Sequence, residues 1–135
     1  MRLLVDANIV LDVALGRTPW VEDSAKLLDA IDTGRAKGFV AGHTVTTLYY
    51  IAAKERGRSG AAAIVADLLR IVKVAPVETG DFLQALGMGL PDFEDAVQVV
   101  AGLNVGADFV ATRNQKDFRG APIPARAPGE ILALL

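Results

Sequence analysis

The sequence predicts a single α/β domain in which a parallel β-sheet of about five strands is flanked by helices on both faces. Short apolar, β-rich segments alternate along the chain with stretches of helical periodicity, which is typical of repeated strand–helix units. The 135 residues, 52% of them hydrophobic, are enough to bury one core. No low-complexity linker or internal repeat divides the chain. We therefore expect one domain over residues 1–135.

In the first part of the chain, a strand is followed by two helices. Residues 3–5 are Leu-Leu-Val, which is apolar on both faces as a buried parallel strand requires. Apolar residues at helical spacing then predict a short helix that ends near Gly16. The same spacing continues from about Pro19 and stops before Gly34, which predicts a second helix.

The middle of the chain contains two further strands and two further helices. Residues 39–41 (Phe-Val-Ala) are the second expected strand. A helix over about 43–57 follows, and another over 59–70 begins at a serine that can cap it. Residues 71–75 are the third expected strand. The pattern therefore keeps the alternation of strands and helices.

The last part repeats the pattern. Helical spacing predicts helices over 79–88 and 92–103, and residues 108–111 are the fourth expected strand. A short fifth strand is expected near Ile123, and the proline at position 128 begins a final helix.

Composition limits the chemistry. The chain has no cysteine and one histidine, so a metal site must be made of oxygen ligands. A formal net charge of −2 gives no overall attraction for nucleic acid. No apolar stretch is long enough for a membrane span or a signal-peptide core, so we expect a cytoplasmic protein without membrane contacts.

Acidic residues gather where strands are expected to end. Asp6 follows the first strand, Asp92 and Asp95 begin a helix, and Asn114 and Asp117 follow the fourth strand. Ligands of parallel sheets bind beyond the carboxyl ends of the strands. Carboxylate oxygens suit Mg²⁺ or Mn²⁺, and such an ion can activate water against a phosphodiester. These residues therefore predict a metal site.

Each acid also has a purely structural interpretation. Asp92 and Asp95 are spaced as a helix N-cap and the third helical residue, where negative charge favours the helix dipole. Asp6 can cap the helix that follows it. Only the convergence of all three segments would favour a functional site.

Four segments together resemble the PIN domain family. They are Leu-Leu-Val-Asp-Ala-Asn-Ile-Val-Leu-Asp-Val (3–13), Leu-Tyr-Tyr-Ile (48–51), Leu-Pro-Asp-Phe-Glu-Asp-Ala-Val-Gln (90–98) and Ala-Thr-Arg-Asn-Gln-Lys-Asp-Phe (111–118). The resemblance implies a PIN-like domain with a parallel sheet. It also implies a ribonuclease dependent on Mg²⁺ or Mn²⁺, such as the VapC toxins of toxin–antitoxin pairs. RNA and an antitoxin protein are then the expected partners.

The family's functional positions map onto this chain residue by residue. Asp6 matches the first metal-binding aspartate, and Asn8 matches the polar residue two positions later. Asp95 matches the acid that opens the later catalytic helix. The last acid falls in the segment that contains Asn114 and Asp117. The resemblance thus implies catalytic roles for Asp6, Asp95, Asp117 and Asn114, and metal binding by the three aspartates.

This chain departs from the family pattern at two positions. Thr46–Thr47 stands where the family often has an acid, and Asn114 stands where the last acid is often found. Fewer carboxylates weaken metal binding. The alternative hypothesis is therefore a binding module for RNA or protein with weakened catalysis. A receiver-like phosphotransferase is disfavoured, because Asn8 replaces the second acid that it needs.

Two surfaces are further candidates. Four basic residues, Arg17, Arg113, Lys116 and Arg119, are candidates for phosphate contacts near the acids. We also expect a homodimer, because the middle helices carry more apolar residues than one face of a small sheet needs. These residues are Tyr49, Tyr50, Ile51, Ile64, Leu68 and Leu69.

Overall fold

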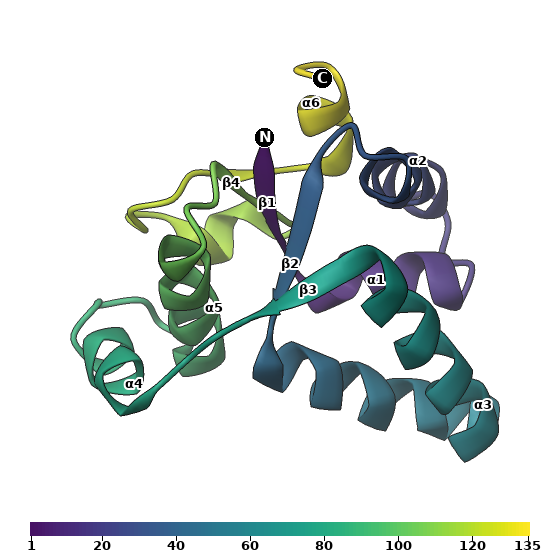
Figure 1. Cartoon of the computed structure of the whole chain (residues 1–135), viewed down its shortest axis with the longest axis horizontal. Helices are drawn as coiled ribbons and strands as arrows, with labels where there is room; N and C mark the ends of the chain where they lie inside the picture. The colour runs from purple at the N-terminus through teal and green to yellow at the C-terminus, as the bar shows by residue number, and fades with distance from the viewer.

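A computed structural model describes all residues, 1–135, and confirms the predicted fold class. Five parallel strands form one sheet in the order β3-β2-β1-β4-β5 (Figure 1). The strands are β1 (Arg2–Val5), β2 (Lys37–Ala41), β3 (Val72–Ala75), β4 (Phe109–Ala111) and β5 (Ala125–Arg126). The first strand in the sequence is therefore the central strand of the sheet.

Helices cover both faces of the sheet. They are α1 (Ala7–Ala14), α2 (Val21–Asp32), α3 (Gly42–Ile71), α4 (Thr79–Leu86), α5 (Phe93–Asn104) and α6 (Pro128–Leu132), with a 3₁₀ turn, η1 (Gln115–Phe118). Figure 1 shows α4 and α5 on one side of the sheet and α1, α2 and α3 on the other. No helix is both long and apolar enough to cross a bilayer.

The alternation of side chains along β1 divides the interior into two cores. Leu3 and Val5 pack with residues of α1, α2, α3 and α6, whereas Leu4 packs on the opposite face with Val99 and Ala101 of α5. All five side chains are fully buried. Both faces of β1 are therefore apolar because both are covered, as the sequence predicted.

Two predicted boundaries need correction. The fifth strand is Ala125–Arg126, two residues beyond Ile123, whose side chain is buried in the core on the α5 side. The two helices predicted over 43–57 and 59–70 form one 30-residue element, broken at Gly57, where φ is 70° and ψ is 172°. Only glycine adopts such a conformation without strain, so the predicted break is real even though no loop separates the two arms.

The parallel register brings the residues of interest to one edge of the sheet. Val5 is level with Ala111 of β4, and the backbone N–H of Asp6 donates to the Ala111 carbonyl over 3.0 Å. Asp6 and the segment after β4 therefore leave the sheet side by side. Helix α3 begins directly after β2 at the same edge.

Candidate functional site

Asp6 lies at the centre of a network of hydrogen bonds at the carboxyl edge of the sheet. Its Oδ1 accepts from the backbone N–H of Ala7 (2.7 Å) and from Nε2 of Gln98 (3.2 Å). Its Oδ2 accepts from Oγ1 of Thr112 (2.8 Å) and Nδ2 of Asn8 (3.2 Å). Three separate elements, α1, α5 and the end of β4, thus fix the orientation of this carboxylate.

Asp95 comes to the same place through Gln98. Nε2 of Gln98 lies 3.2 Å from Oδ1 of Asp6 and 3.3 Å from Oδ1 of Asp95. Because one nitrogen bonds both oxygens, their separation is well below the roughly 10 Å at which two carboxylates can no longer share one ion. Asp95 and Gln98 are three residues apart on α5, so they share a helix face.

Negative charge accumulates around Asp95. Burial raises the pKa of Asp95 from its ordinary value of 3.8 to about 7, together with repulsion from Asp92, Asp6 and Asp117. The hydrogen bond from Gln98 opposes this rise. None of these four aspartates forms an ion pair with a lysine or arginine. We call Asp6, Asp92, Asp95 and Asp117 the acidic cluster; its charge is not balanced by the chain itself.

The capping interpretation also holds for two of these acids. Asp92 is the N-cap of α5, and its Oδ1 accepts from the backbone N–H of Asp95 over 2.9 Å. Asp6 is the N-cap of α1. Capping and membership of the cluster are therefore compatible, because a carboxylate has two oxygens and several acceptor directions.

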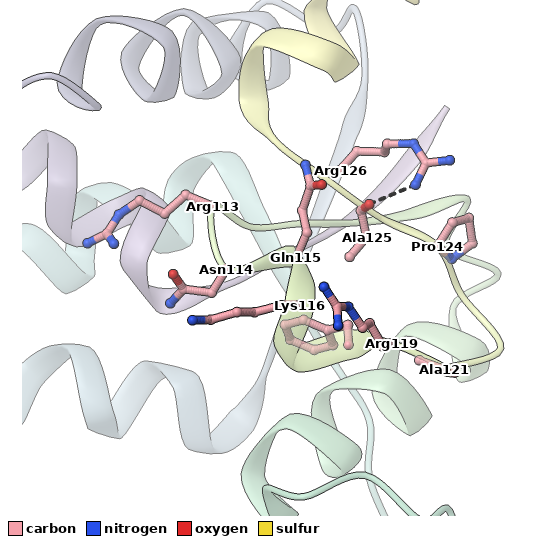
Figure 2. Close-up of a pocket in the computed structure, with 11 residues that line it drawn as sticks. Arg113, Asn114, Gln115, Lys116, Arg119, Ala121, Pro124, Ala125 and Arg126 are labelled. Atoms are coloured by element: carbon pink, nitrogen blue, oxygen red, sulfur yellow. Dashed lines mark hydrogen bonds between the residues drawn. The ribbon is translucent and has the colours of Figure 1, made fainter.

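The segment after β4 contributes less directly. Asp117 lies on η1, is half-buried and acts on Asp95 through its charge. Asn114 is joined to the network through its backbone N–H, which donates to Oγ1 of Thr112 over 3.0 Å. Its side chain lines a neighbouring hollow together with those of Gln115 and Lys116 (Figure 2). Gln98 thus joins Asp6 and Asp95, Asp117 lies close enough to affect Asp95 through its charge, and Asn114 stands at the margin.

The donor set fits a hard divalent cation with few carboxylate ligands. No group of three or more His, Asp or Glu side chains is close enough to hold one ion. Two buried amide oxygens, Asn8 Oδ1 and Gln98 Oε1, have no hydrogen-bond partner, although both amide nitrogens contact Asp6. Magnesium-type ions accept carboxylate and amide oxygens and retain several waters. Two carboxylates with orphaned oxygens beside them match that preference.

Two of the basic residues expected near phosphate are used elsewhere. Arg113 donates through Nε and Nη2 to the two oxygens of Asp12 (2.7 and 3.2 Å) and lies 4.1 Å from the ring centroid of Trp20. Nη1 of Arg17 lies 3.8 Å from Oδ1 of the same aspartate. Both arginines thus serve the fully buried Asp12, which requires positive partners, and their contact with phosphate stays a prediction.

Sequence reasoning gave no role to Gln98, Thr112 or Asp12. Gln98 could have been found from its spacing, one helical turn after Asp95. Asp12 could have been found as an acid among the apolar residues of α1, all of which are buried from Ile9 to Leu11. Thr112 carries no comparable signal, because its partner Asp6 lies 106 positions away.

Comparisons with known proteins agree with the fold. A sequence profile of the PIN domain matches residues 2–116, while no curated protein matches the chain. The chain is similar to the structure of VapBC2 from Rickettsia felis bound to a promoter DNA fragment (TM-score 0.74, 11% identity, covering 94% of this chain and 98% of that chain). It is also similar to VapC20 from Mycobacterium tuberculosis, a toxin that cleaves the sarcin-ricin loop (TM-score 0.70, 14% identity, covering 85% of this chain and 92% of that chain). A third similar structure is DNA-bound VapBC from Salmonella typhimurium (TM-score 0.71, 16% identity, covering 95% of this chain and 98% of that chain).

Proposed function

The chain belongs to the PIN domain family, and on that premise we propose that it is a metal-dependent endoribonuclease and the toxin of a toxin–antitoxin pair. The observation that carries the proposal is the bridge by which one Gln98 nitrogen joins Asp6 and Asp95, within a cluster that no lysine or arginine neutralises. Such a cluster is a poor structural device, since like charges repel at short range. It is a suitable receptor for Mg²⁺ or Mn²⁺.

In the proposed mechanism, Asp6 and Asp95 would hold the ion, and Asp117 would contribute through water. Bound Mg²⁺ or Mn²⁺ supplies activation of water and neutralisation of the charge on phosphate. Thr112 and Asn8 fix the Oδ2 side of Asp6 by donating to it, and Gln98 sets the spacing between the two carboxylates. Asn114 is the N-cap of η1 in the segment after β4, where its side chain lines a hollow that is open to substrate.

The absence of one family carboxylate keeps a second function open. Thr47 is half-buried in the second turn of α3, the helix that begins at the edge of the sheet where Asp6 lies. If Thr47 faces the acids, as the family resemblance implies, a glutamate at this position would add one more negative ligand. Without it, the alternative is a PIN-like module that binds RNA or protein with weakened catalysis.

Calorimetric titration with Mn²⁺, run beside cleavage of a mixed RNA pool, separates these functions. Wild type should bind Mn²⁺ and cut RNA, Asp6→Asn should lose both, and Thr47→Glu should tighten Mn²⁺ binding and raise cleavage. Asparagine keeps the shape of Asp6 and one oxygen that can cap α1, but its amide nitrogen cannot accept from Thr112 and Asn8, so the free energy of unfolding should fall by about 1–2 kcal/mol.

Two outcomes would change the conclusion. If wild type binds RNA but cuts nothing at saturating Mn²⁺, while Thr47→Glu does cut, the alternative function is correct. If none of the three proteins binds Mn²⁺, the shared-carboxylate mechanism is wrong and the acids act as helix caps.

We propose two protein partners, an antitoxin and a second copy of the chain. The VapBC neighbours support the first as the type of complex that this fold forms. For the second, Tyr50 is 65% and Leu69 44% exposed on α3, although Leu68 is buried in the core and is not available. Light scattering at about 50 μM should give a dimer mass, since an interface of standard size with a Kd near micromolar is populated at that concentration. A monomer mass would exclude this dimer.

A further inference from the structure

A basic hollow lies next to the acidic cluster. Its volume is about 870 Å³, and it is lined by residues of η1 and β5, of the loop between them, and of the two positions before η1, Arg113 and Asn114. Four of the lining side chains are cationic and none is acidic. Figure 2 shows that one of the four, Arg113, points away from Arg119 and Arg126. Because Asp12 binds Arg113, three cations remain for a ligand; we call Lys116, Arg119 and Arg126 the basic groove.

The 3₁₀ turn explains how opposite charges are sorted onto two sides. Lys116 lies on η1 and Arg119 is the C-cap of this turn, so one short segment brings both side chains to the lining of the hollow. Asp117, one position later than Lys116, faces elsewhere and acts on Asp95. Arg126 reaches the hollow from β5, at the edge of the sheet.

The three cations have no carboxylate partner. No ion pair within 4.0 Å includes any of them, whereas Lys26 and Arg70 pair with acids on their own helices. Nη1 of Arg126 donates only to the Ala125 carbonyl, over 2.8 Å. Glu130 accepts hydrogen bonds from the backbone N–H of Ala127 and the side chain of Gln115, and these lower its pKa. The charge of Arg126 helps to lower the pKa of Glu130, but the two residues form no ion pair. In a chain of net charge −2, three unneutralised cations in one hollow indicate an anionic ligand.

We propose that the basic groove binds the phosphate backbone of single-stranded RNA next to the bond that is cut. This inference rests on the proposed function. Asn114 lines the groove, and its backbone bonds to Thr112, which in turn donates to Asp6. On this proposal, an RNA strand whose phosphates contact the groove would pass Asn114, which is two hydrogen bonds away from Asp6. Arginine adds guanidinium planes on which unpaired bases stack.

RNA binding without cleavage tests the proposal. A fluorescent single-stranded RNA of mixed sequence is titrated in EDTA, and anisotropy is recorded at several salt concentrations. The triple variant Lys116→Gln/Arg119→Gln/Arg126→Gln should raise Kd about tenfold or more and reduce the slope of log K against log salt by about 2, because each single-strand phosphate contact contributes about 0.7. Arg119→Gln alone should reduce the slope by about 0.7.

The chain offers a matched control. Lys54→Gln/Arg56→Gln/Arg58→Gln removes the same types and number of charges from exposed positions near the break in α3, and it should change Kd less than about twofold. If both triple variants weaken binding equally, binding follows overall charge and the groove is wrong. The groove is equally wrong if neither variant weakens it, or if wild type binds no RNA. Should the groove variant alone lose RNA while wild type binds no Mn²⁺, the groove stands and the proposed nuclease fails.

Discussion

Two carboxylates of this molecule, Asp12 and Asp95, lie in opposite electrostatic surroundings. Asp12 is fully buried, and its two oxygens are bonded by the guanidinium of Arg113, with Arg17 beyond. Asp95 is half-buried and has only the amide of Gln98 and other acids around it. The chain neutralises the carboxylate that it uses to join α1 to the segment after β4. It leaves Asp95 without a lysine or arginine partner.

The largest expected effect comes from breaking the neutralised pair. Arg113→Met leaves Asp12 buried without its main partner, and we expect a loss of about 3–5 kcal/mol in the free energy of unfolding. Urea denaturation measures it. Arg17→Met should cost under about 1 kcal/mol, because that side chain is the more distant, half-exposed partner.

The double variant Asp12→Leu/Arg113→Met checks the cause. An apolar pair of similar volume removes the uncompensated charge, so most of the lost stability should return. A double variant as unstable as Arg113→Met would show that the charge on Asp12 is not the reason.

The second prediction concerns the stability contributed by Asp95 in the acidic cluster, which should change with pH. Because the pKa of Asp95 is about 7 in the folded state and 3.8 ordinarily, the unfolded chain releases this proton first as pH rises. The free energy of unfolding of wild type should therefore fall between these two values, by on the order of 1 kcal/mol after allowance for the partial exposure of the group.

Asp95→Asn is the variant that isolates this dependence. The free energy of unfolding of this variant should not show that fall. Denaturation curves of wild type and variant at about pH 4 and about pH 8 measure the difference. Saturating Mn²⁺ should remove the fall from wild type as well, because a cation favours the ionised carboxylate. A wild-type curve that does not decline over this interval contradicts the environment described for Asp95.

The smallest expected effect comes from replacing Gln98, whose side-chain nitrogen bonds both Asp6 and Asp95. Gln98→Met should raise the pKa of Asp95 further, because the hydrogen bond that stabilises its ionised form is lost. Stability should change by less than about 1 kcal/mol, since the substitution removes a buried oxygen without a partner together with the hydrogen bonds. NMR titration of the Asp95 carboxyl carbon measures the shift. A pKa that falls would mean that Gln98 does not support the charge.

Most of the fold was predictable because buried parallel strands need two apolar faces. Leu-Leu-Val and Phe-Val-Ala have them, and both proved to be strands. Ala125–Arg126 has no such pattern, because an edge strand of two residues needs little apolar surface. The misplaced strand near Ile123 has a physical reason as well. Ile123 is apolar because it packs closely over Gly102 of α5, where a Cβ would lie 2.8 Å from its Cδ1.

The site was predictable only as far as local position determines it. The convergence of Asp6 and Asp95 follows from the ends of β1 and the start of α5, which the sequence marks clearly. The sequence does not show which arginine lacks a carboxylate partner, because Arg113 binds Asp12, which lies 101 positions earlier. Pairings over such distances leave no local pattern, and only the folded chain separates Arg113 from Arg119.

The central place of β1 has a consequence for the order of synthesis. Residues 3–5 are made well before residues 109–111, with which they pair, and Asp6 accepts its hydrogen bond from Thr112, 106 positions later. A ribosome adding about 5–20 residues per second therefore makes these two parts of the site roughly 5–20 s apart. Until then Asp6 has no fixed orientation from β4. For a protein proposed to cut RNA, a nascent chain still on its ribosome is thus inactive until the fourth strand has emerged.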